Sequence, residues 1–319
     1  MPTPVLAMTD RPVRLAFVGQ STYFEACVLD TGTLARFDTR FHEYRGGADV
    51  GPTLESLGAF DPDVVVVFRP EIIPTGAFGG LRATTVGFLT EPLPRTGRGA
   101  GASHEDLERR LWELGEVDGS NFDRIVAFDP LITATADRVL PVWRSIPLPV
   151  SDRYYRPVTA PDPTAPPLFV GRSTEHREAI LTEAKHRFDV LHLAFGVGAD
   201  RLERVMDEHW VAINIHNEPY PSFENRVCLH LAAGHLVASE PLSPSHGLES
   251  GIDYLEFQSG DHLARMLGTL RRDATVWHAV RVRGRRKAEQ FRASRVYPRL
   301  ITDLLADVRA FGSPRAAAA

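Results

Sequence analysis

The chain has 319 residues, a formal net charge of −5 and 43 % hydrophobic residues. A length of this kind predicts two domains or one large one, and the ordinary composition argues against a disordered chain or a membrane bundle. The negative net charge argues against bulk attraction to nucleic acid or acidic lipid.

The cysteines and the N-terminal residues indicate where in the cell the protein is located. The two cysteines, Cys27 and Cys228, lie far apart, which excludes a disulfide framework and favours a reducing compartment. No apolar run reaches the length of a membrane helix, and the start lacks the basic and apolar regions of a signal peptide. We therefore expect a cytoplasmic protein without a transmembrane segment. Of its 36 basic residues, only Lys185 and Lys287 are lysine, so arginine is the main cation available to bind anions.

In the first half of the chain, short β-branched runs alternate with amphipathic stretches. The run at 64–68 is almost continuously apolar, as in a parallel strand buried on both faces. The alternation predicts a doubly wound parallel sheet. The expected strands are 13–18, 64–68, 85–89, 124–128 and 142–146, and the expected helices are 23–29 and 103–114, the latter capped by Ser103.

Residues 147–167 contain seven of the 24 prolines. Proline lacks a backbone donor and disfavours helix before it, so this stretch predicts a semi-rigid interdomain linker. We expect an N-terminal Rossmann-like domain at 12–150, a linker at 151–167, a second Rossmann-like domain at 168–293, and a helix at 294–312 that can return to the first domain.

The same alternation restarts after the linker, which predicts a second α/β half and a cleft between the two. In such sheets, ligands bind beyond the carboxyl ends of the strands. The expected strands are 168–170, 190–194, 210–215 and 236–239, and the expected helices are 175–188, 201–208, 223–233, 261–270, 274–291 and 297–311.

The first candidate site follows the strand at 168–170. Gly171, Arg172 and Ser173 open a helix, so backbone N–H groups and the helix dipole face an anion there. Arg172 can add a charge-assisted hydrogen bond. The alternative interpretation is a plain strand–helix turn capped by Ser173.

Polar residues also gather after the next two strands. Glu240 follows the strand at 236–239, where its carboxylate could accept hydrogen bonds from ligand hydroxyl groups. Taken singly, His216 is more often a hydrogen-bonded loop histidine, Arg226 an ion-pair partner and Glu240 a loop carboxylate. Together they indicate a binding loop, in which Ser222 is expected to cap a helix. The candidate ligand-binding residues after 210–215 are His216, Asn217, Ser222, Phe223, Asn225 and Arg226.

Candidates for a catalytic role lie in the first half. Glu91 follows a buried strand and could serve as a general base, with His42 as a second candidate. Glu43, His104 and Tyr23 are weaker rivals.

Several other patterns have ordinary interpretations. Asp61 and Asp63 have the D-x-D spacing of metal-dependent sugar transferases but precede a strand, so they indicate a turn. Residues 196–201 lack the third glycine of a dinucleotide fingerprint. Cys228, His230 and His235 do not have structural-zinc spacing and are expected to be packing residues. The basic run Arg281, Arg283, Arg285, Arg286 and Lys287 indicates a solvated helix face or, alternatively, peripheral contact with an acidic lipid surface.

The stretch from Asn214 to Leu305 resembles the C-terminal half of GT-B glycosyltransferases, in the "glycosyl transferases group 1" branch related to the spore-maturation protein CgeB. Two of the family's segments also have counterparts further upstream, the F-V-G loop and the F-x-P before the linker. The matching residues are Asn214-Ile215-His216, Ser222, Phe223, Arg226, Val227, Ala232, Gly234, Gly251, Tyr254, Arg283 to Lys287, Val296, Tyr297, Phe169-Val170-Gly171-Arg172 and Tyr155-Arg156-Pro157.

The resemblance implies two Rossmann-like domains and a metal-independent hexosyltransferase without a cofactor. Its donor would be a nucleotide-diphosphate sugar, with the diphosphate near Arg172 and the helix opened by Ser222 and Phe223. The acceptor (a glycan, natural product, lipid or protein) would bind the first domain. One departure is Leu229, which stands where the family usually has the glutamate that meets the donor ribose. The alternatives are therefore a catalytically inactive binding or scaffold protein of the same fold, a nucleotide-sugar epimerase or a dinucleotide oxidoreductase.

Overall fold

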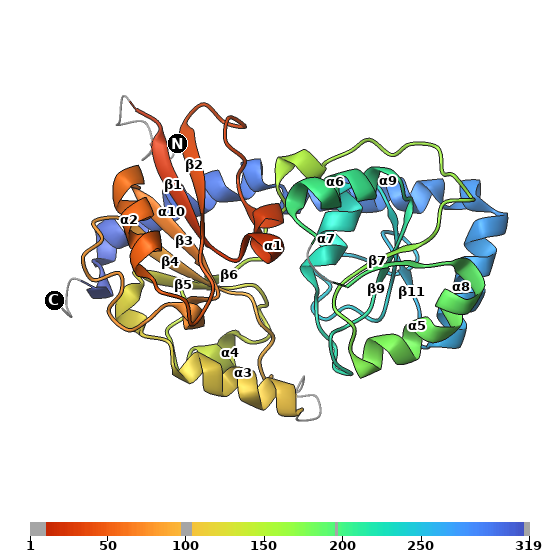
Figure 1. Cartoon of the computed structure of the whole chain (residues 1–319), viewed down its shortest axis with the longest axis horizontal. Coiled ribbons are helices and arrows are strands. Elements are labelled where there is room, and N and C mark those ends of the chain that lie inside the picture. The colour runs from red at the N-terminus through yellow and green to blue at the C-terminus, as the bar shows by residue number, and fades with distance from the viewer. Residues whose placement is uncertain (1–10, 97–103, 195–196, 316–319) are drawn as a thin grey trace. The chain divides into compact units, whose positions relative to one another are not determined.

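The computed structural model describes residues 11–96, 104–194 and 197–315 (Figure 1). The chain divides into two compact units: Met1–Asp152 with Ala293–Ala319, and Arg153–Arg292. The division falls inside the segment where the prolines predict a linker. Among the described helices, none is both long and apolar enough to cross a membrane.

The first unit contains a six-stranded parallel sheet in the order β2-β1-β3-β4-β5-β6. This confirms the predicted doubly wound sheet, and all five residues of β3 are buried as expected. Strand β2 was not predicted, because its sequence FDTRFHE is half polar and its side chains are alternately buried and exposed over most of the strand. The strands are β1 (Val13–Gly19), β2 (Phe37–Glu43), β3 (Val64–Phe68), β4 (Thr84–Leu89), β5 (Arg124–Ala127) and β6 (Arg144–Ser145).

The last long helix belongs to this first unit, as the sequence suggested. Tyr297 of α10 donates a hydrogen bond to the Cys27 carbonyl at 2.6 Å, and its ring meets Phe17 of β1 edge-on. Leu300, Ile301 and Leu304 are also buried in the core of this unit. Its helices are α1 (Ser21–Phe24), α2 (Gly51–Phe60), α3 (Glu105–Gly115), α4 (Thr133–Ala136) and α10 (Ala293–Phe311).

Two predicted helices of this unit differ in the structure. The predicted helix at 23–29 is a single α-helical turn, α1, followed by a 3₁₀ turn at Glu25–Cys27. The predicted cap Ser103 lies outside the described residues, and α3 is capped by His104, whose Nδ1 accepts a hydrogen bond from the backbone N–H of Asp106. Asp61, the left-handed residue at the end of α2, and Asp63 lie in the turn before β3, as expected for a turn.

The second unit contains a five-stranded parallel sheet in the order β11-β10-β9-β7-β8. Strand β8 lies on one side of β7, and β9, β10 and β11 extend on the other. The winding therefore reverses between β7 and β9, so the loops that leave these two strands lie side by side. The strands are β7 (Leu168–Val170), β8 (Leu191–Leu193), β9 (Val211–Asn214), β10 (Leu236–Ser239) and β11 (Leu255–Glu256).

Helices cover both faces of this second sheet. Figure 1 shows α6, α7 and α9 on one face and α5 with α8 on the other. The backbone of α8 packs closely on α5, because a Cβ at Gly260 would lie 2.8 Å from the Ile180 carbonyl oxygen. The helices are α5 (Glu175–Phe188), α6 (Ala199–Asp207), α7 (Asn225–Ala232), α8 (Gly260–Arg272) and α9 (His278–Lys287).

Three predictions for these helices were wrong in detail. The stretch 274–291 is not one α-helix, because 3₁₀ turns at Ala274–Trp277 and Ala288–Phe291 flank α9. Ser222 does not cap α7, which begins at Asn225 after the N-cap Glu224, since the Ser222 hydroxyl is bonded to His216 instead. The cap of α5 is Thr174 rather than Ser173.

Candidate functional site

The loops after β7 and β9 meet at the point where the winding of the second sheet reverses. Arg172 donates from Nε to the side-chain oxygen of Asn217 at 3.0 Å, and the Thr174 hydroxyl donates to the Asn217 carbonyl at 2.8 Å. Ligands of open parallel sheets bind outside the carboxyl ends of the strands at such a reversal. The structure therefore brings two of the predicted donor-binding residues together there.

Arg177 lies beneath these loops and was missed by the sequence analysis. It stands in the first turn of α5 and is only 2 % exposed. Its guanidinium donates to the carbonyls of Ile215 and His216, at 3.2 and 3.1 Å, and to that of Arg172 at 3.1 Å. Arginine is almost never buried unless it is fully hydrogen-bonded, so Arg177 acts as the internal support of both loops.

Arg226, in the first turn of α7, adds a second guanidinium next to Arg177. It donates to the Ile215 carbonyl at 2.9 Å and to the Glu224 carboxylate at 3.0 Å. The guanidinium carbons of Arg226 and Arg177 lie 5.5 and 5.6 Å from the ring centre of Phe169. The two cations are thus held by carbonyls, one aromatic ring and the Glu224 carboxylate.

The site carries more positive than negative charge in its innermost part. Burial and the neighbouring Arg226 lower the pKa of Arg177 to about 9, so Arg177 is still charged at neutral pH. Burial would raise the pKa of Glu224, but Arg226 and Arg177 outweigh it and lower that pKa. Arg172 adds a third guanidinium at the exposed rim. Such an arrangement, next to the N-terminus of α7, favours an anion.

Gly171 is the residue that the two buried guanidiniums approach. Its φ is +156°, and a Cβ would lie 3.3 Å from Nη1 of Arg177 and 3.4 Å from Cζ of Arg226. We expect Gly171→Ala to lower the free energy of unfolding of the second unit by about 1–3 kcal/mol, since it adds backbone strain and crowds both cations. Hydrogen exchange of the second unit's peptides measures this change.

Gly198→Ala is the matched control, because Gly198 has an ordinary φ of −64° and nothing lies within 4 Å of its added Cβ. It should change stability by no more than about 1 kcal/mol, the cost of placing alanine at the N-cap of α6. Equal effects of the two substitutions would show that Gly171 is not under the constraint described.

Three of the predicted donor-binding residues are buried. The His216 Nε2 lies 2.9 Å from the Pro241 carbonyl, which can only accept, so Nε2 carries the hydrogen. Its Nδ1 then accepts from the Ser222 hydroxyl at 2.9 Å, and burial lowers the pKa of His216. Phe223 is 3 % exposed and packs against His246 and Phe291. His216, Ser222 and Phe223 therefore shape the loop after β9 from inside.

The remaining candidates lie around the same strand ends. The Glu240 carboxylate accepts from the His216 backbone N–H at 2.7 Å and lies 3.0 and 3.2 Å from Nε2 of His176. Glu240 thus joins the end of β10 to the loop after β9 and to α5. Ser173 is exposed and bonded to Glu178, and Asn225 is the first residue of α7.

The catalytic candidates of the first unit are far apart from each other. Glu91 follows β4 and forms an ion pair with Arg110, with Arg69 3.8 Å away. His42 is 4 % exposed in β2 and bonds Ser56, and burial lowers its pKa to about 4. The strands β2 and β4 are separated by β1 and β3, which amounts to about 14 Å across the sheet. The two residues therefore cannot act on one proton together.

Of the weaker catalytic candidates, two form local hydrogen bonds and the third is exposed. Glu43 accepts a hydrogen bond from the Ser21 backbone at 2.7 Å, and His104 caps α3. Tyr23 is 62 % exposed on α1. Neither Glu43 nor His104 is thus held ready for proton transfer, while Tyr23 is accessible.

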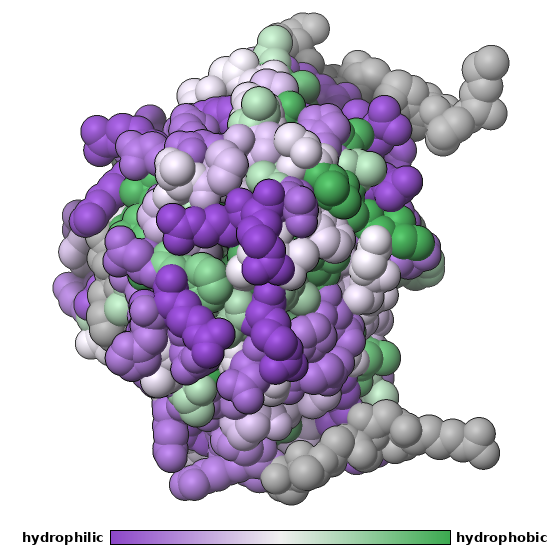
Figure 2. Space-filling model, turned by 90° about the vertical axis from the view of Figure 1, so that its right-hand side faces the viewer, coloured by the Kyte–Doolittle hydropathy of each residue, from purple (hydrophilic) through white to green (hydrophobic). Residues whose placement is uncertain are grey.

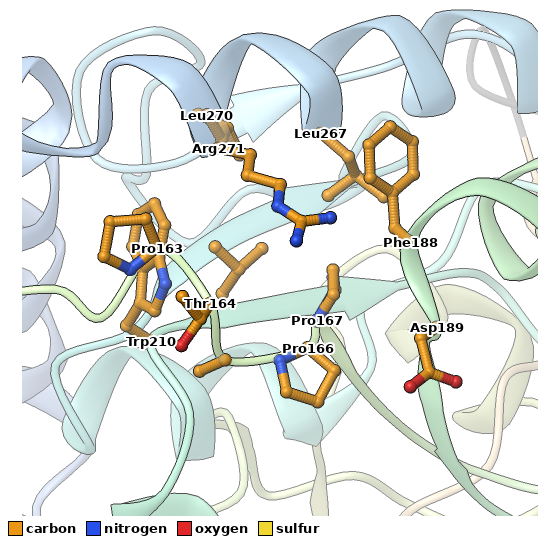
Figure 3. Close-up of a pocket in the computed structure, with 12 residues that line it drawn as sticks. Pro163, Thr164, Pro166, Pro167, Phe188, Asp189, Trp210, Leu267, Leu270 and Arg271 are labelled. Atoms are coloured by element: carbon orange, nitrogen blue, oxygen red, sulfur yellow. The ribbon is translucent and has the colours of Figure 1, made fainter.

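A separate cavity of about 150 Å³ lies at the opposite edge of the second sheet. Its lining includes Pro167, just before β7, and Val211, the first residue of β9. Figure 3 shows Arg271 reaching across the cavity toward Pro167, and Asp189 pointing away from it. Because it lies at the amino ends of the strands, this cavity is distinct from the site at the reversal.

Comparison with known proteins gives matches in structure alone. No family model matches the sequence, and no curated protein sequence matches it. Sucrose-phosphate synthase from Thermosynechococcus elongatus matches at a TM-score of 0.58 and 11 % identity, over 93 % of this chain and 99 % of that one. HepE from Anabaena in complex with UDP matches at 0.52 and 12 %, over 92 % and 100 %.

An enzyme of another class has the same fold. UDP-GlcNAc 2-epimerase from Neisseria meningitidis, bound to UDP-GlcNAc, matches at a TM-score of 0.52 and 8 % identity, over 92 % of this chain and 99 % of that one. At these identities the likeness concerns the fold. The chain has the GT-B fold, with two Rossmann-like units built on parallel sheets.

Proposed function

We propose that this GT-B-fold chain is a glycosyltransferase that moves a sugar from a nucleotide-diphosphate sugar to an acceptor. The observation that carries the proposal is the cluster of Arg172, Arg177 and Arg226 at the winding reversal of the second sheet, with Glu224 as the carboxylate bonded to Arg226. The match to HepE with bound UDP and to sucrose-phosphate synthase supports the same function.

In this proposal the donor diphosphate lies against the N-terminus of α7 and near Arg172. Transfer breaks the bond between the anomeric carbon and the diphosphate oxygen, which leaves negative charge on that oxygen. Arg172 can donate to it directly, while Arg226 and Arg177 provide fixed positive charge below it. Because these cations and the helix dipole balance the leaving charge, we propose that transfer needs no metal ion and no cofactor.

Donor ribose recognition would differ from the usual pattern. Leu229, at the position of the expected glutamate, is 6 % exposed on α7 and packs in the interior. Glu240 is the carboxylate that we propose for the ribose hydroxyls, because its other partners hold it at the end of β10. In the first unit, Glu91 remains the proposed general base, at the end of β4 beside Arg110 and Arg69.

The proposal predicts that UDP, added at about 100 times its Kd, stabilises the protein by about 2.7 kcal/mol. Arg172→Gln should weaken UDP binding by about tenfold to hundredfold without loss of stability, because the side chain is exposed and would lose one charge-assisted bond. Calorimetric titration measures the affinity. Arg226 is less suitable for this test, since its loss also removes a donor from the Ile215 carbonyl and from Glu224.

Arg201→Gln is the control, because Arg201 is exposed on α6 in the same unit and its loss removes the same charge. If other nucleoside diphosphates bind and UDP does not, the proposed donor has a different nucleotide base and the proposal otherwise stands. If none of them binds, the donor site is refuted. Binding without transfer or hydrolysis of the sugar nucleotide would favour a scaffold protein, and conversion of UDP-GlcNAc to its epimer would favour the epimerase.

A further inference from the structure

The basic run from Arg281 to Lys287, near the end of the second unit, has both interior and exposed side chains. Arg281 is 2 % exposed and donates to the carbonyls of Gly234 and Thr159, both at 2.9 Å. Arg285 donates to the Arg156 carbonyl at 2.8 Å and to Glu289. These two arginines therefore stabilise the fold through hydrogen bonds to backbone carbonyls. Arg283 and Arg286 are exposed, one helical turn apart.

The helical stretch 274–291 has one buried and one exposed face. Val280, Ala288 and Phe291 are buried, and a Cβ at Gly284 would collide with the Asp253 carbonyl at 2.4 Å. This packing fixes the rotation of the stretch. The exposed residues of this stretch are Thr275, Val276, His278, Ala279, Arg283, Arg286, Lys287 and Gln290. Among them, Val276, Ala279, Arg283, Arg286 and Gln290 recur every third or fourth position, as expected for one side of a helix.

Two more exposed arginines, Arg271 and Arg272, end the preceding helix α8. We call Arg271, Arg272, Arg283 and Arg286 the basic ridge. Within the described part of the chain, none of the four has a carboxylate within 4.0 Å. Arg272, Arg283 and Arg286 are exposed, and Arg271 is exposed but extends over the cavity at the amino ends of the strands. Figure 2, which views the side of the molecule that carries α8, shows many hydrophilic side chains with hydrophobic ones beside them.

Apolar side chains lie within the basic ridge. Val276 is 69 % exposed in the 3₁₀ turn between Arg272 and Arg283, and Trp277 next to it is half-buried. Arg272 precedes Val276 by four residues and Arg283 follows it by seven, so exposed cations flank Val276 on both sides along the chain. An exposed apolar residue with exposed arginines before and after it in the chain is typical of an interfacial membrane contact.

We propose that the basic ridge and Val276 form a docking surface for a bilayer that contains anionic lipid. The guanidiniums bind headgroup phosphates, and Val276 enters the interface between headgroups and acyl chains. A nucleic acid would use the arginines but not the exposed Val276, so a lipid surface accounts for both features. The docking does not depend on the proposed transferase activity.

The test is sedimentation of the full chain with vesicles of phosphatidylcholine, with and without phosphatidylglycerol. Binding is expected only with phosphatidylglycerol and is expected to weaken at high salt. The triple substitution of Arg272, Arg283 and Arg286 to Gln should reduce binding about hundredfold, since each arginine near an anionic surface contributes about fivefold. Val276→Asp should also reduce it, and Val276→Leu should preserve it.

The matched control replaces Arg45, Arg82 and Arg138 with Gln. These three are also exposed and have no carboxylate within 4.0 Å in the described structure, but they belong to the first unit. Equal loss in both triple variants would mean that net charge alone matters and would overturn the docking surface. Equal binding to vesicles with and without phosphatidylglycerol would also overturn it. The same holds if duplex DNA or heparin binds the chain, if the ridge variant loses that binding, and if Val276→Asp leaves it unchanged.

Discussion

Replacing Arg177 with methionine is expected to lower the free energy of unfolding of the second unit by about 3–5 kcal/mol. The guanidinium is 2 % exposed and donates to three carbonyls, those of Arg172, Ile215 and His216. Methionine fills a similar volume but cannot donate, so the carbonyls of Arg172 and His216 would lose this donor and that of Ile215 would keep only Arg226.

Urea-dependent hydrogen exchange, read peptide by peptide, is the suitable measurement, because the two units need not unfold together. The largest loss of protection should fall on the loops after β7 and β9. Arg187→Met is the control on the same helix, since Arg187 is 58 % exposed and forms a surface pair with Glu183. It should cost no more than about 1 kcal/mol. Similar losses in both variants would contradict the supporting role of Arg177.

The second large effect is a loss of stability at low pH. His230 and His235 are buried side by side, with their Nδ1 atoms 3.1 Å apart. The Nε2 of His235 lies 2.8 Å from the Met206 carbonyl and must carry the hydrogen, so its Nδ1 accepts from His230. Protonating His235 would place two N–H groups against each other. Burial accordingly lowers the pKa of His235 to about 4 and that of His230 well below its usual range.

The direction of the pH effect follows from these pKa values. An unfolded histidine takes up a proton below about pH 6.5, whereas folded His235 stays neutral until about pH 4. The contribution of neutral His235 to the free energy of unfolding is therefore fully present above about pH 6.5. It is lost as the pH falls toward 4, and the loss amounts to about 3 kcal/mol for this histidine alone. His246 in the same unit has a pKa lowered to about 4 by burial and acts in the same direction.

Unfolding by urea at about pH 7 and about pH 4.5 measures this loss. His235→Gln should reduce the difference between the two pH values, because a glutamine amide can still donate to the Met206 carbonyl and does not titrate. His186→Gln, at an exposed position of α5, should leave the difference unchanged. A pH dependence that survives His235→Gln in full would refute the assignment.

The elements that the sequence predicted well are those that carry continuous apolar runs. Strands β3 and β7 were predicted with their observed bounds, because burial on both faces leaves an uninterrupted signal. Strand β2 was missed because polar residues occupy its exposed positions. Helix starts were less accurate: Ser222 has the right side chain for a cap, but its hydroxyl is bonded to His216.

The candidate site was predicted in position but not in its inner structure. Strand ends at Gly171 and Asn214 marked where the loops meet, since parallel strands present their carboxyl ends together. The burial of Arg177 gave no signal, because it depends on carbonyls supplied by a loop some forty residues later in the chain. The arginine in the first turn of the helix that follows Gly171 is a local feature that could have suggested it.

The first unit is assembled from two separate stretches of chain, with the whole second unit between them. Tyr297, Leu300 and Ile301 of α10, which are buried in its core, are synthesised only after the second unit is complete. During translation the second unit can therefore reach its native state first, although its residues come later. The core of the six-stranded sheet is complete only after α10 has been synthesised, so the amino-terminal part finishes packing after the second unit has been made.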